Sequence, residues 1–290
     1  MLQPILVTGA TGNVGQEIIK NLYNQQQSVR AAVVSDEASK RLPVPVEWVR
    51  FDFRDASTYR ATFAGVKKVF LVRPPHISNI ERDMKPAIDY AVKAGVEHIA
   101  FLSLLGAEKN RVVPHAKIEN LLQAGSVNYT LLRCGFFMQN LSTTHRQDIK
   151  EHNDIFIPAG RGKTAFIDVR DIAAVAVKTL TETGHEQQAY PLTGGEALDY
   201  YQVAEIMSQC LGRSIVYGNP SLLRFFWRFW RRGYPVSYIG VVSTIYMTTR
   251  FGLAQTVTPR TQQLLGRAPI SLKQFVQDYA TVWTKDKAHL

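Results

Sequence analysis

The hydrophobic pattern of the first half of the chain alternates short, β-rich apolar runs with longer amphipathic stretches. The apolar runs predict strands over residues 4–8, 29–34, 46–51, 68–72, 99–103 and 129–133. The stretches between them have helical periodicity and predict helices over residues 14–25, 57–64, 80–94 and 116–124. Because crossovers between parallel strands are right-handed, this order predicts an α/β fold with a doubly wound, parallel Rossmann-type sheet.

The pattern changes beyond residue 150. A strand at 164–168 and a helix over 169–181 still resemble a β–α unit, whereas residues 190–290 contain helices over 200–211 and 272–283. We therefore predict a dinucleotide-binding domain over 1–150, to which 164–183 returns. A smaller, mostly helical substrate region is predicted over 151–163 and 184–290.

The segment VTGATGNVG places Gly9, Gly12 and Gly15 directly after a predicted strand and at the opening of a predicted helix. In a dinucleotide loop the first glycine permits the tight turn, the second lets the backbone approach the pyrophosphate, and the third permits close helix–strand packing. The sequence therefore predicts that NADP or NAD binds at this turn, through the residues Gly9, Thr11, Gly12, Asn13, Val14 and Gly15.

Further segments follow this loop in a characteristic order. They are FDFRD at 51–55, LVRPP at 71–75, AGVEHIAFLS at 94–103, HAKIENLL at 115–122, YTLLRCGFFMQNL at 129–141, FIDVRDIAAVA at 166–176, LTGGEALDYYQVAEI at 192–206 and LLGRAPISLKQFVQDYA at 264–280. Over nearly its whole length the chain resembles the NmrA-like group of atypical short-chain dehydrogenases/reductases, which includes NAD(P)H:quinone oxidoreductases.

The resemblance implies contacts with the cofactor beyond the glycine loop. Asp52 and Phe53 are expected against the adenine, and Val72, Arg73 and Pro74 beside the ribose and nicotinamide. Relatives commonly carry V-R-x-x-V-R at the end of the second strand, where an arginine suits the 2′-phosphate of NADP. Here Val34 replaces the second arginine, so the preference between NADP and NAD stays open.

The catalytic groups of a typical superfamily member are only partly present. Lys117 matches the lysine and Ser103 the serine, but Val113 stands where the catalytic tyrosine is expected. His115 is a candidate proton donor near neutral pH or a simple hydrogen-bonding residue. After the sixth strand, Phe136, Phe137, Met138 and Asn140 are candidates for an apolar acceptor slot or for plain core packing. The sequence shows no pattern of metal ligands.

The net charge of +10 is concentrated in the C-terminal part, where no acidic residue occurs between Glu205 and Asp278. No nucleic-acid-binding module accompanies this charge, so nucleic acid is not an expected partner. The segment SLLRFFWRFWRR at 221–232 predicts a helix with Arg224, Arg228, Arg231 and Arg232 on one face and Leu222, Leu223, Phe226, Trp227 and Trp230 on another. Three interpretations stay open: a packed surface helix, a substrate lid, and peripheral contact with an anionic membrane.

Two hypotheses for the function follow. The first is an NAD(P)H-dependent oxidoreductase that transfers hydride to a quinone-like or other small apolar carbonyl acceptor. The second is a non-catalytic NAD(P)-binding redox sensor that acts through a protein partner. The two distant cysteines, Cys134 and Cys210, and an N-terminus without a signal-peptide pattern favour a cytoplasmic location, and a homodimer is left open.

Overall fold

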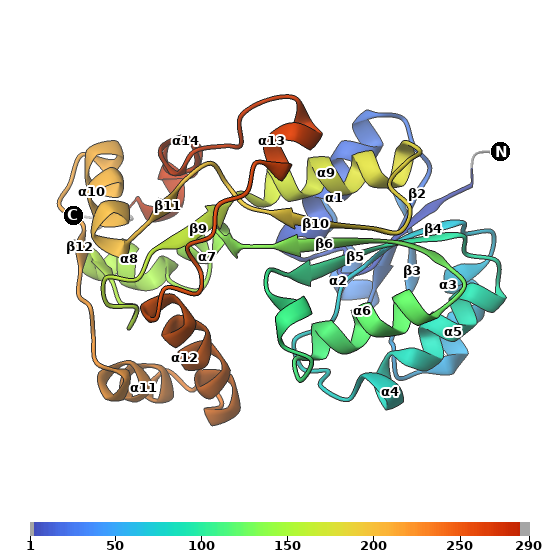
Figure 1. Cartoon of the computed structure of the whole chain (residues 1–290), viewed down its shortest axis with the longest axis horizontal. Coiled ribbons are helices and arrows are strands. Elements are labelled where there is room, and N and C mark those ends of the chain that lie inside the picture. The colour runs from blue at the N-terminus through green and yellow to red at the C-terminus, as the bar shows by residue number, and fades with distance from the viewer. Residues whose placement is uncertain (1–2, 285–290) are drawn as a thin grey trace. The chain divides into compact units, whose positions relative to one another are not determined.

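The computed structural model describes residues 3–284, and the chain divides into two compact units. The first unit combines the residues up to 134 with 169–192, and the second combines 135–168 with the residues from 193 onward. Figure 1 shows the order of the elements along the chain.

The first unit contains a seven-stranded sheet in the order β10-β6-β5-β4-β1-β2-β3, in which every pair of neighbours is parallel. Its strands are β1 (Ile5–Val7), β2 (Val29–Val33), β3 (Glu47–Arg50), β4 (Lys68–Leu71), β5 (His98–Leu104), β6 (Asn128–Cys134) and β10 (Gln188–Leu192). The strand order reverses between β1 and β4, which is the switch point where such sheets bind ligands. The predicted doubly wound Rossmann-type fold is confirmed.

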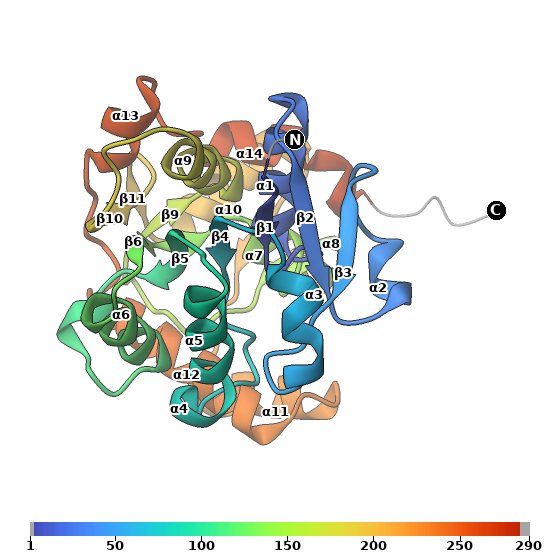
Figure 2. The same cartoon turned by 90° about the vertical axis from the view of Figure 1, so that its right-hand side faces the viewer.

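Helices cover both faces of this sheet (Figure 2). One face carries α1 (Asn13–Asn24) and α9 (Val169–Thr181), and the other carries α3 (Tyr59–Phe63), α5 (Lys85–Lys93) and α6 (Pro114–Ala124). Shorter elements are α2 (Asp36–Ser39), α4 (Ile80–Asp83) and the 3-10 turns Ala56–Thr58 and Ala107–Lys109. The helix predicted over 80–94 is interrupted at Met84, because Pro86 has no N–H to continue the first helix and its ring clashes with the carbonyl four residues earlier.

The second unit is built on two small sheets and a set of helices. The first sheet has the order β11-β9-β7, with β11 at Ala197–Leu198, β9 at Thr164–Ile167 and β7 at Phe136–Phe137. The second pairs β12 (Val216–Tyr217) with β8 (Asp154–Ile155). The helices are α7 (Gln139–Ser142), α8 (Arg146–His152), α10 (Tyr200–Leu211), α11 (Leu222–Arg231), α12 (Val236–Arg250), α13 (Arg260–Leu265) and α14 (Leu272–Asp278), followed by a 3-10 turn at Ala280–Trp283. None of the helices in residues 3–284 is both long and apolar enough to cross a membrane.

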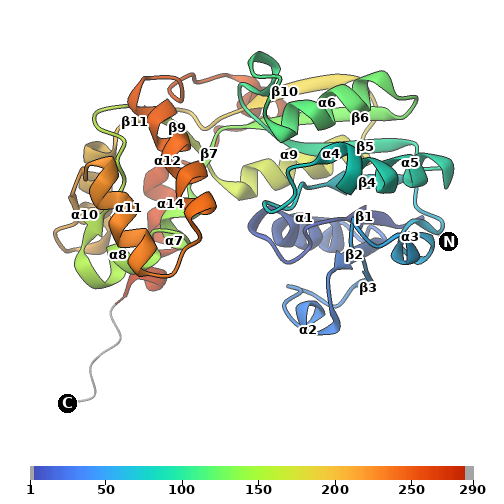
Figure 3. The ribbon, with the colours of Figure 1, turned by 90° about the horizontal axis from the view of Figure 1, so that it is seen from below.

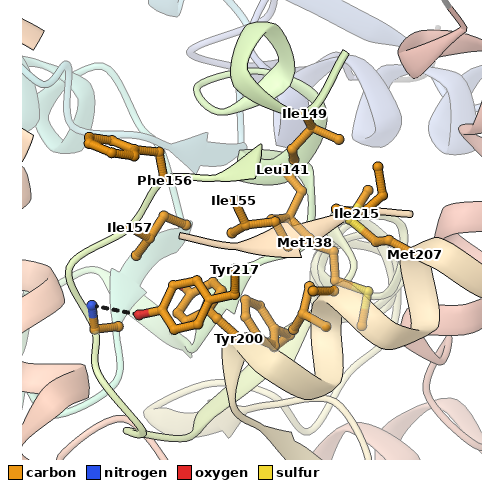
Figure 4. Close-up of a cluster of buried hydrophobic side chains, with 14 of the residues drawn as sticks. Met138, Leu141, Ile149, Ile155, Phe156, Ile157, Tyr200, Met207, Ile215 and Tyr217 are labelled. Atoms are coloured by element: carbon orange, nitrogen blue, oxygen red, sulfur yellow. Dashed lines mark hydrogen bonds between the residues drawn. The ribbon is translucent and has the colours of Figure 1, made fainter. Parts of the chain in front are cut away.

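A separate hydrophobic core holds the second unit together (Figure 4). Its side chains come from α7, α8, β8, α10 and β12 and also from α11, α12 and α14. Tyr200 and Tyr217 lie next to each other with ring centroids 5.6 Å apart. The Tyr217 hydroxyl accepts a hydrogen bond from the Ala159 amide at 3.1 Å, so the one polar atom of this ring is satisfied inside the core.

The boundaries between the units differ from the predicted ones. The first unit ends at Cys134 rather than at 150, because β7 pairs with β9 and carries the chain into the second unit. The returning segment is 169–192 rather than 164–183, because residues 188–192 pair in parallel with β6 as the outermost strand of the large sheet. The sequence prediction assigned these residues to the substrate region.

The predicted faces of α11 also need correction. The side chains that α11 buries are Phe225 and Phe229, both fully enclosed, whereas Trp227 and Trp230 are each 50% exposed. The helix packs against α12, as Figures 1 and 3 both show. The aromatic residues therefore span about half of the helix circumference, and periodicity alone could not tell which of them face the core.

The arginines of α11 do not share one solvated face. Arg228 and Arg232 both form salt bridges with Asp148 of α8, at 2.9 and 2.7 Å, and the Asp148 side chain is completely buried. Burial alone would raise the pKa of Asp148, but hydrogen bonds from Arg232 and the charges of both arginines bring that pKa below its ordinary value. A buried carboxylate requires such partners, and this requirement turns Arg228 and Arg232 inward.

Candidate cofactor site

The turn between β1 and α1 depends on two glycines whose side-chain positions are filled by other atoms. Gly9 has φ +63°, a left-handed conformation, and a Cβ there would lie 3.1 Å from Cβ of Val72. A Cβ on Gly15 would lie 2.2 Å from the Gly9 carbonyl oxygen, far inside van der Waals contact. Gly9 therefore makes the turn possible and Gly15 lets the helix pack against it, which are the roles expected from their positions in the loop.

Gly12 differs from the other two glycines because little of the protein itself lies against it. A Cβ at this position would meet one atom within 4 Å, the Gly9 carbonyl oxygen at 3.2 Å, and the residue is exposed. Gly12 is the N-cap of α1, and neither a side-chain hydrogen bond nor an acidic residue compensates the first turn. The open backbone and the positive end of the helix dipole together fit a diphosphate.

The neighbouring loop residues present different atoms to this opening. Asn13 is exposed and Thr11 is half-buried, whereas the side chain of Val14 is buried. Val14 can therefore contribute only its backbone N–H to a bound anion.

Thr8 fixes the distance between the glycine loop and β4, the neighbouring strand in the sheet. This role of Thr8 was not predicted from the sequence. Its buried hydroxyl donates to the Phe70 carbonyl at 3.0 Å and accepts from the Val72 amide at 2.8 Å. These two bonds hold the end of β4 beside the start of the glycine turn. A threonine directly before the first glycine was the only available signal.

The segment after β4 is held in place by Arg73. Its guanidinium Nη1 donates to the carbonyls of Pro74, Pro75 and Ile77, at 3.0, 3.1 and 2.6 Å. Burial lowers the pKa of Arg73 below its ordinary value. Arg73 therefore shapes its own loop, and its predicted contact with the cofactor, like those of Val72 and Pro74, stays a prediction.

The two residues predicted to lie against the adenine have different accessibility. Asp52 is exposed, and its carboxylate accepts a hydrogen bond from the Arg54 amide at 2.9 Å. The Phe53 ring is buried in the sheet unit's core, 4.7 Å from the ring of Phe51. A ring so enclosed leaves only the backbone at this position available to an adenine.

The end of β2 lacks the expected arginine, but other basic residues lie near it in the sequence or in the sheet, among them the exposed Arg41. Arg30 is bound to Glu47 and to three backbone carbonyls, and Lys40 forms a salt bridge with Glu37. Arg50 is exposed at the carboxyl end of β3, where it is the register partner of Val33. Arg50 is therefore a candidate 2′-phosphate ligand that the sequence analysis did not name.

Two candidate catalytic residues lie in the first turn of α6. Lys117 is exposed, while His115 is partly buried and stacks on Phe101 with ring centroids 6.0 Å apart. Burial and then the nearby charge of Arg73 lower the pKa of His115 to about 4. The imidazole is thus neutral at pH 7 and is a weak source of protons.

Ser103 is bound to a buried ion pair. Its hydroxyl donates to the Glu119 carboxylate at 2.5 Å, and Glu119 also accepts from Arg133 at 2.7 Å. Ser103 and Glu119 are 4% and 2% exposed, so the hydroxyl has a fixed partner away from water. Glu119 and Arg133 were not predicted from the sequence, although an arginine inside the apolar strand run YTLLRC indicates a buried partner.

The residues predicted for the acceptor slot all belong to the second unit. Phe136 and Phe137 form β7 and are half-buried, and Asn140 lies in α7. The same unit contains a cavity of about 250 Å³, whose lining residues are mostly apolar: Met138, Phe166, Gly195, Glu196, Leu198, Pro269, Ile270, Ser271 and Leu272. The predicted slot residues are not part of that lining, apart from Met138.

The fold and the loop geometry define the first unit as a dinucleotide-binding α/β unit. The chain belongs to the NmrA-like family, which matches residues 1–249. This confirms the family resemblance inferred from the sequence motifs.

Relatives and solved structures agree with this assignment. The NAD(P)H azoreductase of Xenophilus azovorans is 32% identical over 285 residues, covering 96% of this chain and 99% of that protein. The NADPH-dependent quinone oxidoreductase of Escherichia coli, solved with NADPH, superposes with a TM-score of 0.84 at 26% identity, covering 95% of this chain and 99% of that one. The triphenylmethane reductase of Citrobacter sp., solved with NADP(H), has a TM-score of 0.82 at 26% identity and the same coverage.

Proposed function

We propose that the protein is an NAD(P)H-dependent oxidoreductase that reduces a quinone-like or other small apolar carbonyl acceptor. The observation that carries this proposal is the start of α1, where an uncapped helix end and the open backbone of Gly12 are free to receive a diphosphate. The similarity to an azoreductase, a quinone oxidoreductase and a triphenylmethane reductase supports redox chemistry.

The proposed roles follow from the chemistry of each group. The loop residues Gly9, Thr11, Gly12, Asn13, Val14 and Gly15 border the diphosphate. The amides at the start of α1 bind it, whereas the Gly12 amide donates to the Gly9 carbonyl at 2.9 Å and closes the turn. Lys117 binds the ribose of the nicotinamide half. Asp52 and the backbone of Phe53 border the adenine, and the loop of Val72, Arg73 and Pro74 borders the other half. When bound in its reduced form, the nicotinamide supplies a hydride.

The acceptor class follows from the lack of a strong proton donor. Val113 replaces the usual tyrosine, His115 is neutral at pH 7 and the Ser103 hydroxyl is bound to Glu119. A quinone takes up a hydride and one proton to form a hydroquinone, whose oxyanion is stable enough to receive that proton from water. An ordinary ketone gives a far more basic alkoxide, which needs an acid in the site.

The first experiment measures oxidation of NADPH and NADH by the purified protein with a panel of quinones. We expect turnover with at least one quinone and none with simple ketones. Lys117→Ala is expected to raise the KM for the cofactor on the order of tenfold, as the loss of one charged hydrogen bond would. Lys93→Ala, at another exposed helical lysine, is the matched control and should change nothing.

A second experiment asks where the acceptor binds. We propose that Phe136, Phe137 and Asn140, with the cavity beside Met138, form the acceptor region. Gly195 lines that cavity, and a Cβ there meets no atom within 4 Å, so Gly195→Phe adds a large side chain at the cavity lining without a clash at its Cβ. The KM for the quinone should rise with the cofactor KM unchanged. Gly240→Phe, which also meets no atom within 4 Å, is the control.

The alternative proposal is a redox sensor that binds the dinucleotide and signals through a protein partner. The same neutral His115 and engaged Ser103 favour it, because a sensor needs no proton donor. Binding of both oxidised and reduced cofactor without turnover on any quinone would establish the sensor over the reductase. A cytoplasmic location and a homodimer stay predictions.

A further inference from the structure

The outward face of α11 is aromatic. Trp227 lies two residues from each of the buried residues Phe225 and Phe229, and two residues of an α-helix are about 200° apart around the axis, so Trp227 points away from the core. Trp227 and Trp230 are each 50% exposed with ring centroids 5.1 Å apart, and Leu223 is 70% exposed. Helices that face water normally place polar residues at the centre of the outward side.

The four arginines of this helix have two different functions. Arg228 and Arg232 are bound to the buried Asp148, and the Arg228 guanidinium also lies 3.3 Å from the ring centroid of Phe156. These two residues anchor the helix. Arg224 and Arg231 are exposed beside the tryptophans, and Arg231 lies 5.7 Å from the Trp227 ring centroid.

The charge of the outward face is not compensated by neighbouring acidic residues in the sequence. No aspartate or glutamate occurs between Glu205 and Asp278, which includes all of α11 and α12. The face therefore combines two half-exposed indoles with two free positive charges. A partner that fits it offers an apolar layer for the indoles and anionic groups at the level of the arginines.

We propose that α11 is a docking surface for an anionic lipid bilayer, with the helix lying in the plane of the membrane interface. Indoles prefer the boundary between headgroups and acyl chains, and exposed arginines at that level pair with lipid phosphates. A second copy of this chain fits less well, because a two-fold contact through this face places two cationic surfaces against each other, with no acidic residue in α11 or α12 to pair with Arg224 and Arg231. This proposal does not depend on the proposed reductase activity.

Flotation of the whole protein with vesicles tests the proposal. Vesicles of neutral phosphatidylcholine are compared with vesicles that also contain phosphatidylglycerol, at low and at high salt. We expect binding to the anionic vesicles at low salt, a large decrease at high salt, and a blue shift of the tryptophan emission on binding. The absence of binding to anionic vesicles at low salt would overturn the proposal.

Variants assign the binding to this face. Each of Arg224→Gln and Arg231→Gln should weaken the anionic-vesicle affinity about fivefold, and the double variant Trp227→Ser/Trp230→Ser on the order of tenfold or more. Trp48→Ser removes a similarly exposed tryptophan from β3, in the other unit, and should leave binding unchanged. Unchanged far-ultraviolet circular dichroism and thermal midpoint show that the variants fold.

Two further measurements separate this proposal from its competitors. Light scattering gives the oligomeric state, and a dimer that the tryptophan variant dissociates, in a protein that does not bind vesicles, would show that α11 is a subunit interface instead. Oxidation of NADPH by a water-soluble quinone without vesicles should be the same for wild type and variants. A loss of that activity in the tryptophan variant with unchanged vesicle binding would assign α11 to the acceptor region and overturn the membrane proposal.

Discussion

Replacement of Gly12 by alanine separates cofactor binding from folding. Gly12 has φ −83° and ψ 168°, which alanine adopts readily, and the added Cβ would meet one protein atom within 4 Å, at 3.2 Å. Removing a glycine lowers the entropy of the unfolded chain, which stabilises the fold, while alanine is a poorer N-cap than glycine by about 1 kcal/mol, which destabilises it. The free energy of unfolding should therefore change by no more than about 1 kcal/mol.

The effect on the cofactor should be much larger. The methyl group would occupy the open side of the helix N-terminus, where a diphosphate has to approach the backbone amides. Hydrogen bonds to charged groups contribute about 1.5–3 kcal/mol each, so the loss of one corresponds to a roughly 10- to 150-fold weaker Kd. Isothermal titration calorimetry with NADPH and with NADH measures this loss, and urea unfolding measures stability in the same variant.

Gly15→Ala is the contrasting variant, because its Cβ would lie 2.2 Å from a backbone oxygen. It should lose both stability and binding. An unchanged Kd in Gly12→Ala would refute the reasoning, since the diphosphate could not then lie against this glycine. A large loss of stability in Gly12→Ala would also refute it, because the site would then be packed by the protein itself.

Three other predictions follow from the structure. Thr8→Val leaves the Val72 amide without its acceptor and should lower the free energy of unfolding by about 1–3 kcal/mol in urea titrations; an unchanged value would mean that the turn does not rely on this hydroxyl. Arg50→Ala should raise the KM for NADPH several-fold and leave that for NADH unchanged, whereas equal effects on both would exclude contact with the 2′-phosphate. The free energy of unfolding should be constant above about pH 6.5 and fall as the pH decreases toward 4. The decrease is up to about 1.4 kcal/mol per pH unit for each buried histidine, because in this range the histidine is protonated in the unfolded chain but neutral in the folded protein. These histidines are His98, His115 and His145, whose pKa burial lowers to about 4. A free energy of unfolding that does not change between about pH 6.5 and 4 would contradict their burial.

Most elements of the first unit could be predicted because their signals are local. Each strand is a short apolar run between turn residues, and each glycine of the loop has a conformational reason that depends on its immediate neighbours. The helix over 169–181 and the helix over 200–211 were predicted at their observed bounds. The second of these is delimited by a capping box between Asp199 and Gln202 and by Gly212 in a left-handed conformation.

The faces of α11 could not be predicted because they depend on a residue far away in the sequence. The apolar side of this helix spans about half of its circumference, and the pattern does not tell which part of that side faces the core. Asp148, on α8, selects one orientation by binding Arg228 and Arg232, and Phe225 and Phe229 are buried as a consequence. The position of β10 is a similar case, because an edge strand of five residues gives no local sign of the strand it will join.

The chemistry of the site also depends on pairings that motifs do not reveal. The motif suggests that Ser103 and His115 are available for proton transfer, yet one hydroxyl is bound to a buried ion pair and one imidazole is kept neutral by burial. Both changes remove acidity from the same group of residues, and neither changes the glycine loop on which dinucleotide binding depends. A site that has the glycine loop for the dinucleotide but no strong proton donor suits an acceptor whose reduced oxyanion can take its proton from water. A quinone is therefore a better expected substrate than a ketone.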